Sequence, residues 1–256
     1  MTEDKPSALV IGAHMDDCEA GLAGVSCRLA RDGWRVVFLV TIGDVSALPA
    51  FATKERADEF RGQAVAAARL LGAEKLFLNY QHNLLHPSDP RVVVDIARVI
   101  QAVNPTLAFV PWPQDNHYDH ARTARAAMEA LSYSNRMAGG QPVDLHLKEI
   151  LAYEISSWQT RDFAPDFYIN VGPDIETILA SMNTFRVFSE VTLRHYTDEM
   201  RYRRQSWGVG AYYPYAEGLK HLGPEFPLRS LLPGLLGADL RPVGSLQYPW
   251  GGRWFA

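Results

Sequence analysis

From residue 8 to residue 110, short apolar runs alternate with longer segments in which apolar residues recur at helical spacing. Expected strands lie at 8–11, 35–41, 75–78 and 107–110, and expected helices lie at 19–32, 54–71 and 91–103. Uninterrupted apolar strands such as 36–40 are typical of a sheet that is covered on both faces. The alternation therefore predicts an α/β fold with a Rossmann-like, doubly wound and mostly parallel sheet.

The pattern changes after about residue 148. Runs at 150–154 and 167–171 predict further strands, 175–188 predicts a helix, and the polar, basic stretch 194–204 predicts a solvated helix face. Prolines and aromatic residues crowd the last segment, so we expect an irregular C-terminal extension over about 222–256, packed on the domain or on a partner subunit. We find no linker or internal repeat, and a single domain over residues 1–256 is the simplest organisation.

Charge and hydropathy exclude several classes of partner. A formal net charge of -4 gives no basic surface for nucleic acid or anionic lipid. The sequence contains no apolar run long enough to span a bilayer and no N-terminal secretion signal, so we expect a cytoplasmic protein. The aromatic C-terminal segment favours self-association into a homo-oligomer as an additional hypothesis.

Two groups of ionisable residues follow two of the expected strands. The first comprises His14, Asp16 and Asp17, and the second comprises His117, Asp119 and His120. In a parallel sheet, ligands bind beyond the carboxyl ends of the strands, where both groups are expected to lie. Burying so many unpaired ionisable groups is costly, so their joint placement favours a functional site over a structural one.

The residue types suit a metal centre. His14, Asp17 and His120 form a set of two imidazoles and one carboxylate, which is typical of a hydrolytic Zn2+ and also suits Fe2+. Asp16 is then a spare carboxylate, able to take a proton from water. His117 is expected to face the same cavity.

Asp119 is an expected orienting partner for an imidazole, because a carboxylate fixes the tautomer of a neighbouring histidine. Simpler interpretations exist for some of these positions. An Asp–Asp pair after a strand is often only a helix N-cap, and Cys18 is better explained as a small packed residue than as a ligand. The remaining histidines lack ligand spacing and are interpreted as structural or surface residues: His82, His86, His146, His195 and His221.

The two motifs resemble the signature of the LmbE/PIG-L family of zinc-dependent N-deacetylases. Members typically carry Ala-His-Pro-Asp-Asp-Glu after the first strand and His-x-Asp-His after a later strand. This chain has Ala-His-Met-Asp-Asp-Cys-Glu at 13–19 and His-Tyr-Asp-His at 117–120. Weaker matches at 67–72, 153–154, 165–168 and 215–217 extend the resemblance over nearly the whole chain.

The resemblance implies a role for each motif residue. His14, Asp17 and His120 would bind the metal, and Asp16 would act as the general base. His117 would stabilise the oxyanion or protonate the leaving amine, with Asp119 tuning His117. The implied reaction is hydrolysis of an N-acetyl amide on a glucosamine-type sugar or sugar conjugate.

The chain departs from the family pattern at two positions, since Met15 replaces proline and Cys18 stands where glutamate is common. The family's substrate contacts are not matched securely, and Arg56, Asn83 and Asp44 are candidates for this role. One alternative is an amidase that acts on another N-acyl group or on a thiol conjugate. A non-enzymatic alternative is a sugar-binding domain with a structural metal, although structural zinc usually has four protein ligands.

Overall fold

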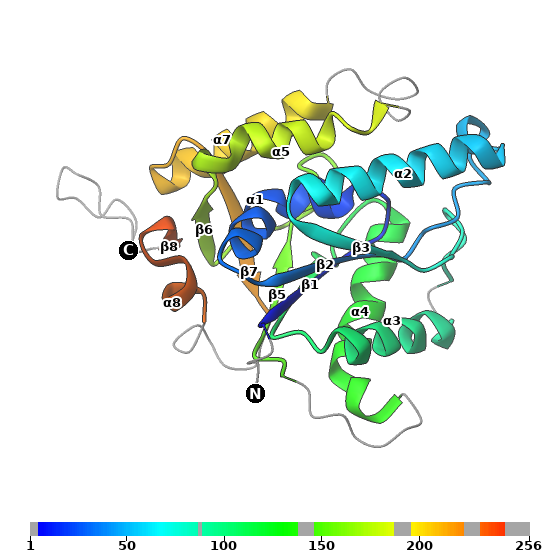
Figure 1. Cartoon of the computed structure of the whole chain (residues 1–256). Coiled ribbons are helices and arrows are strands. Elements are labelled where there is room, and N and C mark those ends of the chain that lie inside the picture. The colour runs from blue at the N-terminus through cyan, green and yellow to red at the C-terminus, as the bar shows by residue number, and fades with distance from the viewer. Residues whose placement is uncertain (1–4, 87–88, 138–145, 187–195, 223–230, 244–256) are drawn as a thin grey trace.

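The computed structural model describes residues 5–86, 89–137, 146–186, 196–222 and 231–243. Its strands form one sheet in the order β3-β2-β1-β4-β5-β7-β6-β8 (Figure 1). The strands are β1 (Ser7–Gly12), β2 (Arg35–Val40), β3 (Ala73–Phe77), β4 (Leu107–Pro111), β5 (Glu149–Tyr153), β6 (Phe167–Asn170), β7 (Ala216–His221) and β8 (Leu240–Pro242). The first five of these pair in parallel, whereas β7 is antiparallel to both β5 and β6, and β8 is antiparallel to β6.

Helices cover both faces of the sheet. One face carries α1 (Asp17–Arg31), α2 (Lys54–Leu70), α5 (Ile175–Met182) and α7 (Tyr196–Ala211), and the other carries α3 (Pro90–Val103) and α4 (Tyr118–Met137) (Figure 1). The buried apolar residues accordingly form two clusters, one on each side of the sheet. The predicted α/β, doubly wound and mostly parallel architecture is confirmed.

Local sequence signals set the helix boundaries. At the start of α3, the Asp89 side chain accepts a hydrogen bond from the Arg91 N–H at 2.9 Å, and Pro90 occupies the first turn. The helix ends at Asn104, whose φ of 47° is left-handed and turns the chain into β4. Such caps account for the accuracy of the sequence-based boundaries in this half of the chain.

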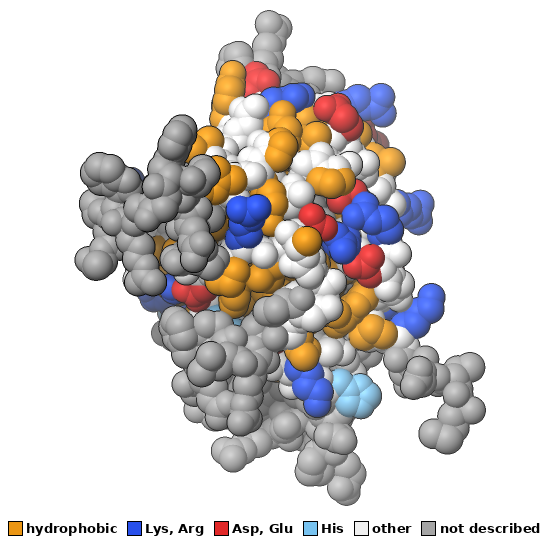
Figure 2. Space-filling model, turned by 90° about the vertical axis from the view of Figure 1, so that its left-hand side faces the viewer, with side chains coloured by type: hydrophobic (Ala, Val, Ile, Leu, Met, Phe, Trp, Pro, Cys, Tyr) orange, Lys and Arg blue, Asp and Glu red, His pale blue; other side chains and the backbone are white. Residues whose placement is uncertain are grey.

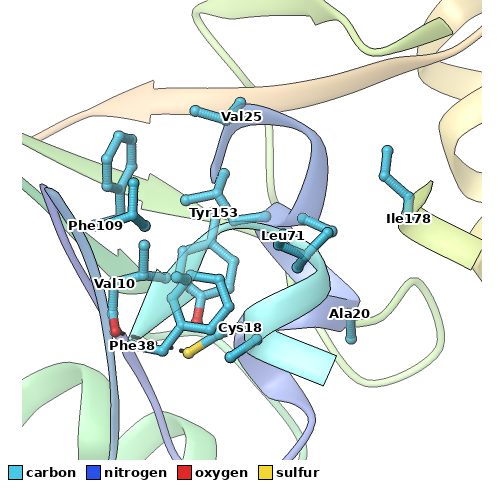
Figure 3. Close-up of a cluster of buried hydrophobic side chains, with 14 of the residues drawn as sticks. Val10, Cys18, Ala20, Val25, Phe38, Leu71, Phe109, Tyr153 and Ile178 are labelled. Carbon is cyan, nitrogen blue, oxygen red and sulfur yellow. Dashed lines mark hydrogen bonds between the residues drawn. The ribbon is translucent and has the colours of Figure 1, made fainter. Parts of the chain in front are cut away.

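The core beneath α1 contains Cys18. Its thiol points into the apolar cluster and contacts the Val10 carbonyl at 3.7 Å (Figure 3). Nearby, the Tyr153 hydroxyl donates to the Ile11 carbonyl at 2.8 Å. Burial raises the pKa of the Cys18 thiol well above its ordinary value. Cys18 is therefore a packed core residue, in agreement with the structural interpretation of this position.

The second half of the chain differs from the prediction in several places. The helix expected at 175–188 ends at Met182, and residues 187–188 lie outside the described residues. The stretch 194–204 does contribute to a helix, α7, but the expected solvated face was wrong, because Arg203 and Arg204 are buried.

The C-terminal extension is not irregular throughout. Its described part contains α8 (Leu232–Leu236) and β8, which pairs with β6 at the edge of the sheet. Residues 223–230 and 244–256 lie outside the described residues. On the face shown in Figure 2, basic and acidic side chains are interspersed, as the small net charge would suggest. Among the described helices, none combines the length and apolar character needed to cross a membrane.

Candidate metal centre

The site lies where the strand order reverses. β1 has β2 on one side and β4 on the other, and the crevice beyond the carboxyl ends of such strands is the usual ligand site in open α/β sheets. The segment after β1 supplies His14, Asp16 and Asp17, and the segment after β4 supplies His117, Asp119 and His120. The two predicted groups therefore meet at this point of the sheet.

A tight turn after β1 is fixed by Asp17. The Asp17 Oδ2 atom accepts hydrogen bonds from the backbone N–H groups of Ala13 and His14, both at 2.8 Å. A Cβ atom at Gly12 would lie 2.9 Å from the Asp17 Cβ and 3.0 Å from the Cys18 Sγ, so this close approach requires glycine. The turn leaves the second Asp17 oxygen, Oδ1, free to face the histidines.

Three predicted ligand atoms converge. His14 Nδ1 and His120 Nε2 are 3.2 Å apart, and Asp17 Oδ1 lies 3.6 Å from the first and 3.5 Å from the second. Ligand atoms bound to one tetrahedral Zn2+ are about 3.3–3.6 Å apart, given bond lengths of roughly 2.0–2.2 Å. The donor set and its spacing thus fit a single divalent cation. The side chain of His14 is 15% exposed, which leaves this edge of the site accessible.

Each ligand imidazole has a carboxylate on its other nitrogen. Asp119 Oδ2 lies 3.1 Å from His14 Nε2, and Asp115 Oδ1 lies 3.2 Å from His120 Nδ1. Such carboxylate–histidine pairs fix the ring orientation and raise the basicity of the metal-facing nitrogen. The Asp119 carboxylate contacts His14, and Asp119 contacts His117 through its backbone N–H, so its tuning of His117 stays a prediction.

Asp115 was missed by the sequence analysis. Its Oδ2 atom accepts from the Thr160 hydroxyl at 2.9 Å, and its Oδ1 atom accepts from the His117 N–H at 2.7 Å. The available signal was its position two residues before His117, on the same loop after β4. Its link to Thr160, in the loop after β5, could not be inferred from spacing.

The carboxylates determine the charge of the ligand set. Although burial alone would lower it, Asp17 and Asp119 raise the pKa of His14 to about 10. Against the same effect of burial, Asp17 and Asp115 raise the pKa of His120 to about 9. Burial would raise the pKa of Asp17, but His120 and His14 hold it well below its ordinary range. The site therefore requires positive charge, which either protons or a dication can supply.

Asp16 precedes α1 but does not cap it. It occupies the N-cap position, yet its side chain makes no capping hydrogen bond, so the interpretation of Asp16 as a structural cap is not supported. The side chain is buried, and burial together with the nearby negative charge of Asp17 raises its pKa. A carboxylate in this environment has an increased affinity for a proton.

His117 lies against both ligand imidazoles. Its ring centroid is 4.5 Å from that of His14 and 4.6 Å from that of His120. Burial and the positive charges of these two rings lower the pKa of His117 to about 4, so it is neutral at pH 7. The Asp119 N–H donates to His117 Nδ1 at 3.2 Å, which places the ring proton on Nε2.

His82 is a second residue that the sequence analysis missed. Its ring centroid is 4.9 Å from that of His14 and 5.6 Å from that of His117, so its classification as a structural or surface histidine, outside the site, was wrong. It follows β3, whose carboxyl end lies at the same edge of the sheet, and this placement was the available signal. His195 lies outside the described residues.

The three candidates for substrate contacts occupy different environments. Asp44 lies in the loop after β2 and accepts from the Ser46 N–H at 2.9 Å. The exposed Asn83 donates its backbone N–H to Asp119 Oδ2 at 2.9 Å, and its φ is 61°. Arg56 lies on α2, 3.3 Å from Glu59. The structure thus places Asn83 against the site, whereas Arg56 is engaged on the helix surface.

Comparison with known proteins identifies similar sequences and folds. Residues 9–131 match the family described as PIG-L, GlcNAc-PI de-N-acetylase. A diacetylchitobiose deacetylase from Thermococcus kodakarensis is 25% identical over 235 residues, which cover 85% of this chain and 83% of the relative. The resemblance predicted from the two motifs is confirmed.

Two solved structures share the fold at low sequence identity. The N,N'-diacetylchitobiose deacetylase from Pyrococcus horikoshii has a TM-score of 0.70 at 21% identity, with 86% of this chain and 85% of that chain covered. GalB, the 4-carboxy-2-hydroxymuconate hydratase from Pseudomonas putida KT2440, has a TM-score of 0.74 at 20% identity, with 88% and 99% covered. The fold is therefore shared by proteins with different reactions, and the function must be argued from the site.

Proposed function

We propose that the chain, whose residues 9–131 match the PIG-L family, is a metal-dependent N-deacetylase acting on a glucosamine-type sugar or sugar conjugate. The observation that carries the proposal is the convergence of His14, Asp17 and His120 at separations of 3.2–3.6 Å. We propose Zn2+ as the ion, and Fe2+ would suit the same donor set.

The ion would be held by these three side chains, with Asp119 and Asp115 orienting the two imidazoles. When bound, it supplies Lewis acidity, which polarises the amide carbonyl and makes water more acidic. Since a structural zinc site is usually closed by four protein ligands, a three-residue set is better suited to catalysis than to a structural role.

Asp16 is the proposed general base. Its carboxylate takes a proton from the attacking water as oxygen bonds to the amide carbon, and the raised pKa favours this transfer. The same carboxylic acid then returns the proton to the sugar nitrogen as the C–N bond breaks. The products are acetate and a free amine, and Asp16 is ionised again.

His117 is the proposed donor to the oxyanion. Because its Nδ1 accepts from the Asp119 N–H, the neutral ring presents an Nε2–H group for the developing negative charge. A single donor of this kind contributes about 10²–10³-fold to the rate. Of the two roles implied for His117, this tautomer favours oxyanion stabilisation over protonation of the leaving amine.

Substrate contacts are proposed at the same edge of the sheet. The names of the similar archaeal proteins support an N-acetylglucosamine-type substrate. Asp44 and Asn83, on loops after β2 and β3, are proposed to bind sugar hydroxyls. Arg56, on α2, is retained as a weaker proposal for the same role.

Acetate release from N-acetylglucosamine and diacetylchitobiose tests the function directly. We expect the Asp16→Asn variant to retain its metal while losing at least ~100-fold in rate, as expected for removal of a general base. Asp58→Asn, an equivalent change at an exposed position on α2, is the matched control. The proposal fails if the protein contains no stoichiometric divalent metal and Asp16→Asn turns over normally. Addition of water to an unsaturated acid, without hydrolysis of any amide, would instead indicate a hydratase.

A further inference from the structure

A second group of metal-binding side chains lies beside the first. The ligand atoms of His14, His82, His117 and Asp119 all fall within 4.8 Å of one another. His82 has no part in the proposed deacetylation, and it comes from the loop after β3 rather than from either predicted motif. We propose that His82, His117 and Asp119 bind a second divalent cation, which inhibits the enzyme.

Two atoms in this group are buried without a hydrogen bond. Among the described residues, neither Asp119 Oδ1 nor His82 Nδ1 has a hydrogen-bonding partner. The other Asp119 oxygen already interacts with His14 Nε2 and the Asn83 N–H, at 3.1 and 2.9 Å. Leaving a buried acceptor unsatisfied usually costs about 1–3 kcal/mol, so native structures seldom retain one without a reason. A cation between His82 and Asp119 would satisfy both side chains.

The chemistry of the three residues suits the ions that also fit the first site. Two imidazoles and a carboxylate match Zn2+ and similar divalent metals, whereas Mg2+ and Ca2+ prefer oxygen ligands. His14 need not leave the first site, because its Nε2 continues to interact with Asp119 Oδ2 while Oδ1 faces the second ion. The two sites would therefore share Asp119 as an orienting and a ligating group.

The second ion should bind more weakly than the first. Coordination through His117 Nε2 moves the ring proton to Nδ1 and breaks the 3.2 Å hydrogen bond from the Asp119 N–H. The same change removes the Nε2–H donor that is proposed to stabilise the oxyanion. Inhibition by excess metal follows from this loss, and this part of the inference depends on the proposed deacetylase function.

Counting bound ions tests the site without reference to activity. The protein is dialysed against buffers of fixed free Zn2+, and the bound zinc is measured by mass spectrometry. We expect the wild type to bind one ion tightly and a second at higher free Zn2+. His82→Phe keeps an aromatic ring but offers no ligand atom, and we expect it to bind only the first ion. His86→Phe, on the same loop but outside both groups, should still bind two.

Acetate release at rising free Zn2+ tests the inhibition. We expect excess zinc to inhibit the wild type and His86→Phe alike, and to require at least ~10-fold more zinc in His82→Phe, with inhibition measured relative to each protein's own activity at one bound ion. The inference is overturned if His82→Phe still binds two ions, or if the wild type binds only one where its activity falls. If no acetate is released at any zinc concentration, the deacetylase proposal fails, while the ion count still decides whether the second site exists.

Discussion

Helix α1 connects two buried clusters of charged side chains that differ in how completely their hydrogen-bonding groups are paired within the protein. The first is the metal centre at its N-terminus. The second, here called the kink cluster, comprises Arg203, Arg204 and Glu217 around Leu22, where the helix is interrupted at a φ of -139°. Both clusters are buried and both bring together segments that are far apart in the sequence.

In the kink cluster, donors and acceptors match. The interruption exposes the N–H groups of Gly24 and Val25, and the Glu217 carboxylate accepts both at 2.9 Å. Arg204 donates to Glu217 at 2.6 and 2.9 Å and to the Ala20 carbonyl at 3.0 Å. Glu217 neutralises Arg204, and Glu199 lies 3.8 Å from Arg203, so the cluster supports the fold without any added ligand.

The metal centre lacks this balance. Three carboxylates, from Asp17, Asp115 and Asp119, surround two imidazoles whose nitrogens face each other at 3.2 Å. These two nitrogens and the Asp17 Oδ1 atom converge on one point, and only imidazole protons are available to hold them together in the metal-free protein. A buried cluster that completes its own hydrogen bonds is structural, whereas one that leaves donor atoms converging on a point is suited to a ligand.

Breaking the kink cluster should have the largest effect. We expect Glu217→Leu to lower the free energy of unfolding by about 3–5 kcal/mol, because it leaves Arg204 buried without its partner. Urea denaturation measures this change. The metal content of the folded protein should not change, since Glu217 does not contact the metal ligands.

A double variant is the control for this prediction. Glu217→Leu combined with Arg204→Met removes both charges, and it should be less destabilised than Glu217→Leu alone. Equal destabilisation of the two variants would show that the lost bonds to Gly24 and Val25, rather than the uncompensated charge, dominate. A large loss of metal from either variant would contradict the separation of the two clusters.

Metal affinity should rise steeply with pH. In the metal-free protein, His14 and His120 have pKa values raised to about 10 and about 9, so both are protonated at pH 7. A cation must displace both protons, and its affinity should increase by up to about 100-fold per pH unit between pH 7 and 9. Calorimetric titration in buffers of different ionisation enthalpy should detect about two protons released per ion.

The raised pKa values of His14 and His120 also predict how the stability of the metal-free protein depends on pH. Groups with raised pKa values stabilise the folded state fully below their unfolded value of about 6.5, and this contribution is lost as pH rises through 9 and 10. The melting temperature of the metal-free protein should therefore fall over this range, and bound metal should abolish the fall. If the calorimetric titration instead detects almost no protons released on metal binding, the two imidazoles are neutral before the ion binds.

Loss of an orienting carboxylate should have a smaller effect. We expect Asp115→Asn to weaken metal binding by about 10–100-fold, because the His120 ring loses its charged partner while its metal-facing nitrogen remains. Competition with a chelator of known affinity measures the change. Thr160→Val removes only the hydroxyl that holds Asp115, and it should also weaken metal binding, but by less than Asp115→Asn. Unchanged affinity in Asp115→Asn would show that its 3.2 Å contact with His120 does not support the site.

The sequence predicted the parts of the molecule that depend on periodicity and strand order. His14, Asp17 and His120 could be brought together because the carboxyl ends of parallel strands meet at one edge. Asp115 and His82 could not, since loop conformations place them. Asn83, beside His82, adopts a φ of 61°, and Asp115 is held by Thr160 across 45 residues of sequence.

The kink cluster could not be predicted from the sequence either. The apolar spacing of 19–32 is that of a continuous helix, and nothing in it indicates the interruption at Leu22. Without the interruption there is no reason to bury Arg203 and Arg204, and the polar stretch in which they lie is typical of an exposed helix. The antiparallel insertion of β7 between β5 and β6 likewise depends on long-range packing.

The smallest effects are expected at the proposed substrate contacts. Asp44 lies on the loop after β2, at the carboxyl edge of the sheet where the metal centre is, whereas Arg56 lies on α2 beside Glu59. We expect Asp44→Asn to raise KM by about 2–10-fold, the range for one lost hydrogen bond to a sugar hydroxyl, with little change in kcat. Arg56→Ala should change KM by less than about twofold, because exposed helix pairs contribute little. Steady-state kinetics on N-acetylglucosamine and diacetylchitobiose distinguish these outcomes. A larger effect from Arg56 than from Asp44 would move the sugar-binding surface from the loop after β2 to helix α2.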